Sequence, residues 1–92
     1  MIKSFKCCHT ENMFNGKRIE RFMSIQFSAM RKLAILNVAG TIEDMRVPPG
    51  NRLGALKGNR QGQWSVRIND HWRICFRFEA GNAFDVEIVD YH

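Results

Sequence analysis

Two different hydrophobic patterns divide the chain near its middle. In the first half, apolar residues recur every three or four positions, which predicts an amphipathic helix over residues 24–38 that ends at Gly40. The apolar positions of this stripe are Phe22, Ile25, Ala29, Leu33 and Leu36. A shorter first helix is predicted over residues 10–15, with Thr10 as its N-cap and Gly16 as its stop.

The second half of the chain alternates apolar and polar residues with the period of a β-strand. Three alternating runs cover residues 63–69, 72–79 and 83–89, and short polar turns separate them. Such runs predict a meander of antiparallel strands, and residues 2–5 predict one further short strand. Because one face of the sheet is apolar and must be covered, we expect an α+β fold with two N-terminal helices packed on a small antiparallel sheet.

The alternation also sorts the side chains between the two faces of the predicted sheet. Trp64 and Trp72 fall on the apolar face, as do Phe84, Val86 and Ile88 of the last run, so both tryptophans are predicted to belong to the core. The opposite face carries Ser65, Arg67, Arg73, Arg77 and Glu87.

Several arginines on one sheet face repel one another, so this face favours a bound anion. An equally consistent alternative is that each arginine pairs with an acid on the next strands, from among Glu79, Asp85 and Glu87.

The length of the chain and the position of its loop residues predict one domain, residues 1–92. The sequence Val47-Pro48-Pro49-Gly50-Asn51 predicts a loop inside this domain, and Thr41 is expected to cap a short turn through Asp44 just before it. No apolar run is long enough for a transmembrane helix, and the first residues lack the apolar stretch of a secretory signal. The odd number of cysteines, three, favours reduced thiols, so we expect a cytoplasmic protein.

The charge is concentrated in one part of the chain. The net charge is +5, and residues 46–77 contain seven basic residues against one acid, Asp70. Nine of the 14 basic residues are arginine, whose planar guanidinium matches phosphate oxygens. We therefore expect a polyanionic partner, which is nucleic acid, an acidic protein or both.

Three motifs follow one another in the second half of the chain. They are L-x-x-L-x-G-x-x-x-G-x-W-S-x-R over residues 53–67, N-x-x-W-R-I-x-F over residues 69–76, and D-Y-H over residues 90–92. In this order, and in a chain this short, they resemble the host-inhibition-of-growth (HigB-type) toxins. These toxins are a branch of the RelE/ParE superfamily and belong to type II toxin–antitoxin modules.

The resemblance implies a fold, an activity and a set of partners. The fold would be the one that the periodicity already favours. The activity would be that of an endonuclease that cuts messenger RNA on the ribosome and so stops translation and growth. The implied partners are the ribosome, the message and an antitoxin with a helix-turn-helix domain, through which alone DNA would be bound. No membrane and no cofactor are implied.

The resemblance also implies a site for metal-independent RNA cleavage, in which the 2′-hydroxyl attacks the adjacent phosphate. Lys57 and Arg73 would stabilise the charge that develops on phosphorus, and Arg67 would help to hold the phosphate. The acid–base groups would come from the chain terminus, Asp90, Tyr91 and His92. The further RNA-binding residues would be Arg60 and Arg77. No carboxylate cluster in the sequence suggests a metal site.

One position departs from the family pattern. Some members carry a histidine three residues before the matching lysine, where this chain has Gly54. The main alternative is therefore a non-catalytic toxin that binds and inhibits the ribosome or DNA gyrase. The terminal Asp-Tyr-His favours the nuclease, because an inhibitor that only binds needs no acid–base cluster. A plain RNA-binding sheet is a third possibility, disfavoured by the absence of aromatics at the outward strand positions.

Overall fold

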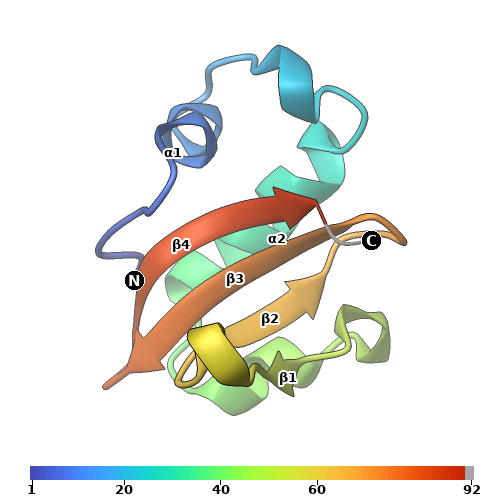
Figure 1. The fold of residues 1–92 in the computed structure, drawn as a ribbon. Coiled ribbons are helices and arrows are strands. Elements are labelled where there is room, and N and C mark those ends of the chain that lie inside the picture. Colours follow the sequence, from blue (N-terminus) through green and yellow to red (C-terminus); the bar gives the residue numbers. More distant parts are fainter. Residues whose placement is uncertain (91–92) are drawn as a thin grey trace.

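The computed structural model describes residues 1–90 and places two helices on one face of a four-stranded antiparallel sheet (Figure 1). In chain order the helices and strands are α1 (Cys8–Phe14), α2 (Gln26–Val38), β1 (Gly54–Ala55), β2 (Trp64–Arg67), β3 (Trp72–Glu79) and β4 (Asn82–Asp90). Four short 3-10 turns connect them: η1 (Glu20–Phe22), η2 (Ile42–Arg46), η3 (Pro49–Asn51) and η4 (Gly58–Arg60). The strand order is β1-β2-β3-β4, which confirms the predicted α+β architecture and meander.

The core lies between α2 and the covered face of the sheet. Ala29, Leu33 and Leu36 of α2 are buried, and Ile74 and Phe76 of β3 are buried on the sheet side. The helix begins at Gln26, two residues later than predicted, but the preceding residues of the stripe are still buried. Both tryptophans pack against this core, as predicted, and the Trp72 ring meets the Phe22 ring edge-on at 5.5 Å between centroids.

The first helix differs from the prediction at its start. It begins at Cys8, so Thr10 is not its N-cap. Instead Thr10 is buried, and its hydroxyl accepts a hydrogen bond from the backbone N–H of Ile88 at 3.1 Å. A buried N–H must be paired, so this contact to β4 takes precedence over local capping. The predicted stop is confirmed, because Gly16 follows the helix with φ +97°.

A β-bulge in β4 overturns one predicted side-chain position. Cys75 pairs with Glu87 but Arg77 pairs with Phe84, so β4 contains one residue more than β3 between these pairs. The extra residue reverses the alternation, and Asp85 adopts a φ of +55° there. Ala83 and Val86 are therefore both buried, whereas Phe84 lies on the other face, where the Arg77 guanidinium carbon is 5.2 Å from its ring centroid. The prediction of Phe84 on the apolar face was wrong.

At the two edges of the sheet, the structure differs from what the hydrophobic pattern predicts. The predicted strand over residues 2–5 is reduced to two isolated parallel bridges, Ile2 to Ala83 and Phe5 to Val86. At the other edge, β1 was not predicted, because two residues are too few for a periodic signal. Gly54 of β1 pairs with Ser65 of β2.

The turn after Gly40 has the predicted capping box. The Asp44 carboxylate accepts hydrogen bonds from the backbone N–H of Gly40 at 2.9 Å and of Thr41 at 3.1 Å. These two hydrogen bonds cap the start of η2, directly after α2. In residues 1–90 we find no helix that combines the length and the apolar character needed to cross a membrane.

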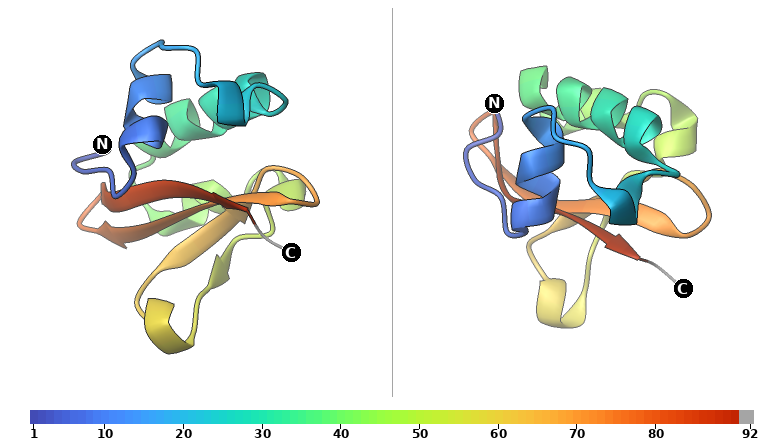
Figure 2. Two further views of the ribbon diagram at one scale, coloured as in Figure 1. Left: turned by 45° about the horizontal axis from the view of Figure 1, so that its top comes forward. Right: turned by 90° about the horizontal axis from the view of Figure 1, so that it is seen from above.

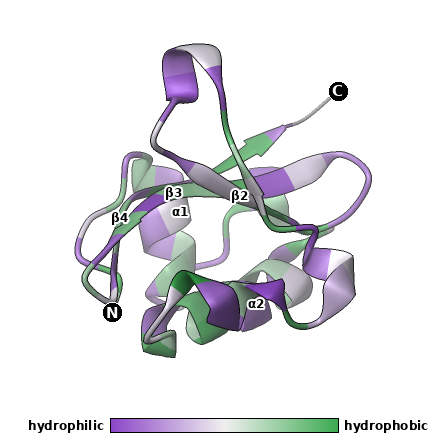
Figure 3. Cartoon of the chain, turned by 90° about the horizontal axis from the view of Figure 1, so that it is seen from below, coloured by the Kyte–Doolittle hydropathy of each residue, from purple (hydrophilic) through white to green (hydrophobic). Residues whose placement is uncertain are grey.

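The two faces of the sheet have different surroundings. The helices lie over one face, and the polar turn that contains η4 projects from the opposite side (Figures 2 and 3). We call this second side the open face and define it by Ser65, Arg67, Arg73, Cys75, Arg77 and Glu87.

Candidate functional site

The strand register arranges the open face in rows. Arg67, Arg73 and Val89 are Cα partners across β2, β3 and β4, and Ser65, Cys75 and Glu87 form the next row. Sequence alternation placed the polar members on this face, and the structure confirms it. Two arginines therefore stand directly opposite each other on neighbouring strands, which is unfavourable unless negative charge is close.

Arg73 lies near the start of β3, an inner strand of the sheet, and is held there by a neighbour. Its Nη1 donates a hydrogen bond to the Ser65 hydroxyl at 2.8 Å, and Ser65 is only 1% exposed. Arg67 is half-buried and forms an ion pair with the carboxylate of Asp70 in the β2–β3 turn. A fixed guanidinium loses less conformational freedom when it binds a phosphate, so this arrangement prepares Arg73 for an anion.

The η4 turn folds back towards the open face through an ion pair. Arg60 Nη1 lies 2.7 Å from Glu87 Oε1 on β4 and donates a hydrogen bond to the Gln63 side chain at 3.1 Å. The Glu87 side chain is 13% exposed, and this partner raises the pKa of Arg60. Lys57 precedes η4 and is exposed. The ion pair thus fixes the turn that carries Lys57 against the sheet.

Cys75 is buried beneath these charged side chains. It is 2% exposed although no helix covers it, and burial raises the pKa of its thiol. The charged groups around the thiol are Arg60, Glu87, Arg73 and Lys6. Lys6 was missed by sequence reasoning, because only the pairing of the N-terminal segment along β4 brings it here. Glu87 was placed on the correct face, but its pairing with Arg60 had no signal in the sequence.

Arg77 fits the alternative interpretation, in which each arginine of this face pairs with an acidic residue on the next strands. Its Nε lies 2.9 Å from Asp85 Oδ2, and its Nη1 lies 3.3 Å from Glu79 Oε1. Both acids were named as possible partners from the strand order, so this interpretation is confirmed for Arg77. Its charge is therefore balanced by two carboxylates.

The chain terminus is described only as far as Asp90, and the predicted Tyr91 and His92 lie outside the described residues. Asp90 is exposed and has Trp72 as its Cα partner. Alternation from Ile88 puts Asp90 in the helix-side row at the end of the sheet, whereas Arg73 pairs with Val89. The register therefore does not bring Asp90 and Arg73 into the same row.

Gly54 lies beside the site without any steric need for glycine. It pairs with Ser65, and a Cβ added there would meet only the carbonyl oxygen of Arg52, at 3.9 Å. As far as residues 1–90 are concerned, a side chain at this position has room next to the row of Arg73. Among residues 1–90 no group of three or more His, Cys, Asp or Glu is placed to hold a metal ion.

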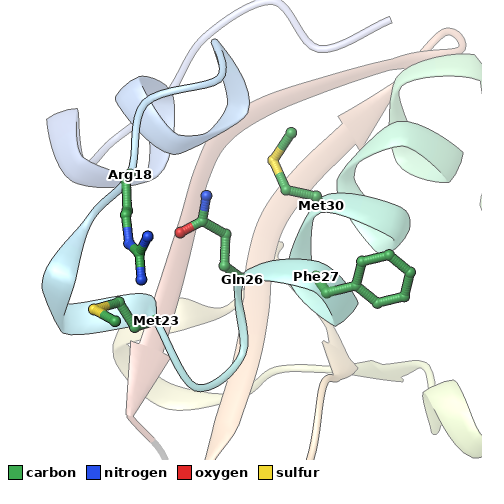
Figure 4. Close-up of a pocket in the computed structure, with 5 residues that line it drawn as sticks. All are labelled: Arg18, Met23, Gln26, Phe27 and Met30. Carbon is green, nitrogen blue, oxygen red and sulfur yellow. The ribbon is translucent and has the colours of Figure 1, made fainter.

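Two hollows flank α2. The first, of about 460 Å³, is lined by Arg18, Met23, Gln26, Phe27 and Met30 (Figure 4). Phe27 points away from the others and is 78% exposed. The second hollow, of about 250 Å³, is lined by Ser28, Arg31, Lys32, Ile35, Pro48 and Ile68. Of the predicted site residues that the structure describes, none lines either hollow.

Comparison with solved structures defines the class of the fold. YafQ from E. coli BL21(DE3) superposes with a TM-score of 0.60 at 10% identity, covering 98% of this chain and 91% of YafQ. The YoeB/ParE toxin from Agrobacterium tumefaciens superposes with a TM-score of 0.56 at 20% identity and 98% coverage of both chains. The fold is therefore that of these small toxins.

Comparison of sequences identifies the family. The family described as RelE-like toxin of type II toxin-antitoxin system HigB matches residues 3–92. Toxin HigB-1 of Vibrio cholerae serotype O1 is 36% identical over 87 residues, which is 92% of each chain. The chain thus belongs to the HigB-like toxins of type II toxin–antitoxin systems, and the resemblance inferred from its motifs is confirmed. A protein named Endoribonuclease HigB from Proteus vulgaris is 44% identical over 41 residues, 45% of each chain.

Proposed function

We propose that this toxin is an endoribonuclease that cuts messenger RNA on the ribosome, and that the open face holds the RNA at the cut. The observation that carries the proposal is Arg73 on the inner strand β3, held by Ser65 and directly opposite Arg67. A cation that is held in place and half-buried is suited to a phosphate whose negative charge grows during reaction. The name of the Proteus vulgaris relative supports the same activity.

The proposed reaction is attack of a ribose 2′-oxygen on the neighbouring phosphorus. The new bond joins the 2′-oxygen to phosphorus, and the bond from phosphorus to the 5′-oxygen breaks, leaving a 2′,3′-cyclic phosphate and a free 5′-hydroxyl. Arg73 and Lys57 stabilise the added charge on the phosphoryl oxygens, while Arg67 and Arg60 hold flanking phosphates. The scheme needs no metal, because the cationic side chains stabilise the added charge and residues 90–92 transfer the protons.

The proton transfers are assigned to the chain terminus. A base takes the proton from the 2′-hydroxyl and an acid delivers one to the leaving 5′-oxygen. His92 is suited to either task because imidazole titrates near neutral pH. Asp90 would act as a base or orient its neighbours, and Tyr91 would stack on a base or donate a hydrogen bond to the phosphate. Arg77, whose charge is opposed by two carboxylates, would contribute least to RNA binding.

The proposed partners follow from membership of the toxin–antitoxin family. We propose a cognate antitoxin with a helix-turn-helix domain, which alone would contact DNA, and the ribosome with its message as target in the cytoplasm. The solved YoeB–YefM complex from Staphylococcus aureus, which shares the fold with a TM-score of 0.57 at 14% identity, supports a protein partner.

The decisive test is cell-free translation with purified toxin, followed by primer extension on the message. Arg73→Ala should lower cleavage by at least about a hundredfold, the usual scale for losing one group that stabilises transition-state charge. A chain lacking residues 90–92 should also lose cleavage. The matched control is Arg46→Ala, because Arg46 is exposed on η2 and pairs with Glu43 of the same turn. If the Arg73→Ala toxin cleaves the message as efficiently as the wild type, Arg73 does not belong to the site.

Gly54 supports a second candidate, a toxin that blocks its target by binding alone. The position has room for a side chain but supplies no acid–base group beside Arg73. In the same assay, blocked translation with an intact message would favour this candidate. Unaffected translation together with growth arrest would point to DNA gyrase. Cuts that need both ribosomes and residues 90–92 would favour the nuclease.

A further inference from the structure

The second hollow beside α2 is a basic pocket, and neither Lys57, Arg73 nor Asp90 lines it. Ser28, Arg31, Lys32 and Ile35 follow one another at helical spacing and form its wall on α2. Pro48 of the loop before η3 and Ile68 after β2 form the opposite wall. The pocket thus combines two cations and a hydroxyl on one side with apolar side chains on the other.

Lys32 is held in this pocket by a buried amide. Its Nζ donates a hydrogen bond to the side-chain oxygen of Asn51, which is 1% exposed. The Asn51 amide in turn donates to the carbonyls of Met45 at 3.0 Å and Val47 at 3.3 Å, so its orientation is fixed. An ammonium has three donors and Asn51 accepts only one of these hydrogen bonds. The partner is neutral, so the positive charge of Lys32 is not balanced by it.

The positive charges at this pocket are close enough to act on one another. Burial lowers the pKa of Lys32, and the charges of Arg31 and Arg67 lower it further. Among the described residues, neither Arg31 nor Lys32 forms an ion pair with a carboxylate. Gathering like charges disfavours folding, so an arrangement of this kind is expected where an anion binds.

The pocket continues the open face around one end of the sheet. Arg67 is the last residue of β2 and the partner of Arg73, and the next residue, Ile68, lines the pocket. We propose that the pocket of Ser28, Arg31, Lys32 and Ile68 is a second phosphate subsite for the RNA strand that Arg73 holds. The ribose or base of that nucleotide would contact Ile35 and Pro48. This proposal rests on the proposed function, because it extends the same RNA path.

The test uses purified toxin and a single-stranded RNA hexanucleotide with 2′-O-methyl groups, which cannot be cut by 2′-oxygen attack. Arg31→Gln and Lys32→Gln should each weaken binding about five- to tenfold at low salt and reduce the salt slope by about one unit, as expected for one phosphate contact. Arg31 is exposed, so its variant does not depend on the Asn51 contact for folding. Lys17→Gln is the matched control, because Lys17 is exposed in the loop after α1 and should change neither quantity.

Three results would overturn the subsite. The first is wild-type affinity and salt slope in both the Arg31 and Lys32 variants. The second is no RNA binding by the wild-type toxin at about 50 mM salt, where convergent cations should bind any single strand. The third is equal displacement of the RNA by a polyglutamate of the same charge, which would favour an acidic protein. Failure of the subsite is separable from failure of the nuclease, because Arg73→Ala would still abolish cleavage if only the subsite were wrong.

Discussion

The two faces of the sheet bury side chains to a similar depth by different means. On the helix side, Ile74 and Phe76 are 0% exposed beneath α2. On the open face, Ser65 and Cys75 are 1% and 2% exposed, although α1 and α2 lie over the other face of the sheet. Charged groups surround them instead, with Arg73 bonded to Ser65 and the Arg60–Glu87 pair near Cys75.

This difference separates stability from function within one strand. Apolar burial under a helix gives folding energy in proportion to area. Arginines over a polar row give little net stability, because desolvation offsets much of the Coulomb attraction. The helix side is therefore expected to carry the fold, and the open face to carry the binding of RNA. Substitutions on β3 can test this division of roles, because consecutive residues of this strand point to opposite faces of the sheet.

The largest effect on stability is expected from Phe76→Ala. Removing a fully buried aromatic ring leaves a cavity under α2 and should lower the free energy of unfolding by about 3–5 kcal/mol. The matched variant is Cys75→Ala on the open face, which removes only one sulfur atom and should cost about 1 kcal/mol or less. Urea unfolding of both variants measures the difference. Equal losses would mean that the open face is as much a part of the core as the helix side.

A smaller effect is expected from Glu87→Gln, which removes the charge that holds the η4 turn against the open face. The ion pair with Arg60 is partly buried, so its loss should lower the free energy of unfolding by about 1 kcal/mol. Lys57 lies on the same turn, and its displacement should lower cleavage about tenfold. Urea unfolding and primer extension on the same preparations test both effects.

The matched control for Glu87→Gln is Glu79→Gln. Glu79 also pairs with an arginine of this sheet, but its side chain is 67% exposed and its distance to Arg77 is 3.3 Å. Its loss should change neither stability nor cleavage by a measurable amount. If Glu79→Gln lowers cleavage as much as Glu87→Gln does, the effect belongs to the overall charge of the sheet and not to the position of the η4 turn.

The sequence predicted the regular parts of both faces and missed the contacts made between distant segments. The alternation of apolar and polar residues predicted β3 with its observed bounds and placed Arg73 on the open face. The same alternation failed at Phe84, because a β-bulge with Asp85 at positive φ has no periodic signal. Thr10, at first sight a helix cap, pairs with Ile88 across the fold.

The residues of the candidate site also divide into those that the sequence predicts and those that only the tertiary structure brings together. Arg67 and Arg73 follow from strand periodicity, and Lys57 follows from the family motif. The Arg60–Glu87 pair and the approach of Lys6 depend on how a turn and the N-terminal segment pack on β4. The pocket of Arg31 and Lys32 depends on Asn51, which lies 19 positions away from Lys32 along the chain. Such contacts belong to the tertiary structure and leave no local pattern.

The smallest effect is expected outside both faces, at the capping box after α2. The backbone N–H groups of Thr41 and Gly40 hold the pKa of the Asp44 carboxyl below its usual value. A lowered pKa in the folded state stabilises the fold wherever the carboxyl is ionised in the unfolded chain. The stabilisation is therefore complete above about pH 4, the ordinary pKa of aspartate, and is lost as the pH falls through the lower folded pKa.

Asp44→Asn should accordingly lower the melting temperature slightly at pH 7, and the difference from wild type should shrink as the pH falls below about 4. Glu43→Gln is the matched control, since Glu43 lies on the same turn but pairs with Arg46 and accepts no N–H of the cap. Neither variant should alter cleavage, because neither residue belongs to the open face. A loss of cleavage in Asp44→Asn with unchanged melting would place function in the helical layer and refute the division between the two faces. A melting difference that persists unchanged at low pH would instead show that the Asp44 charge has no part in the cap.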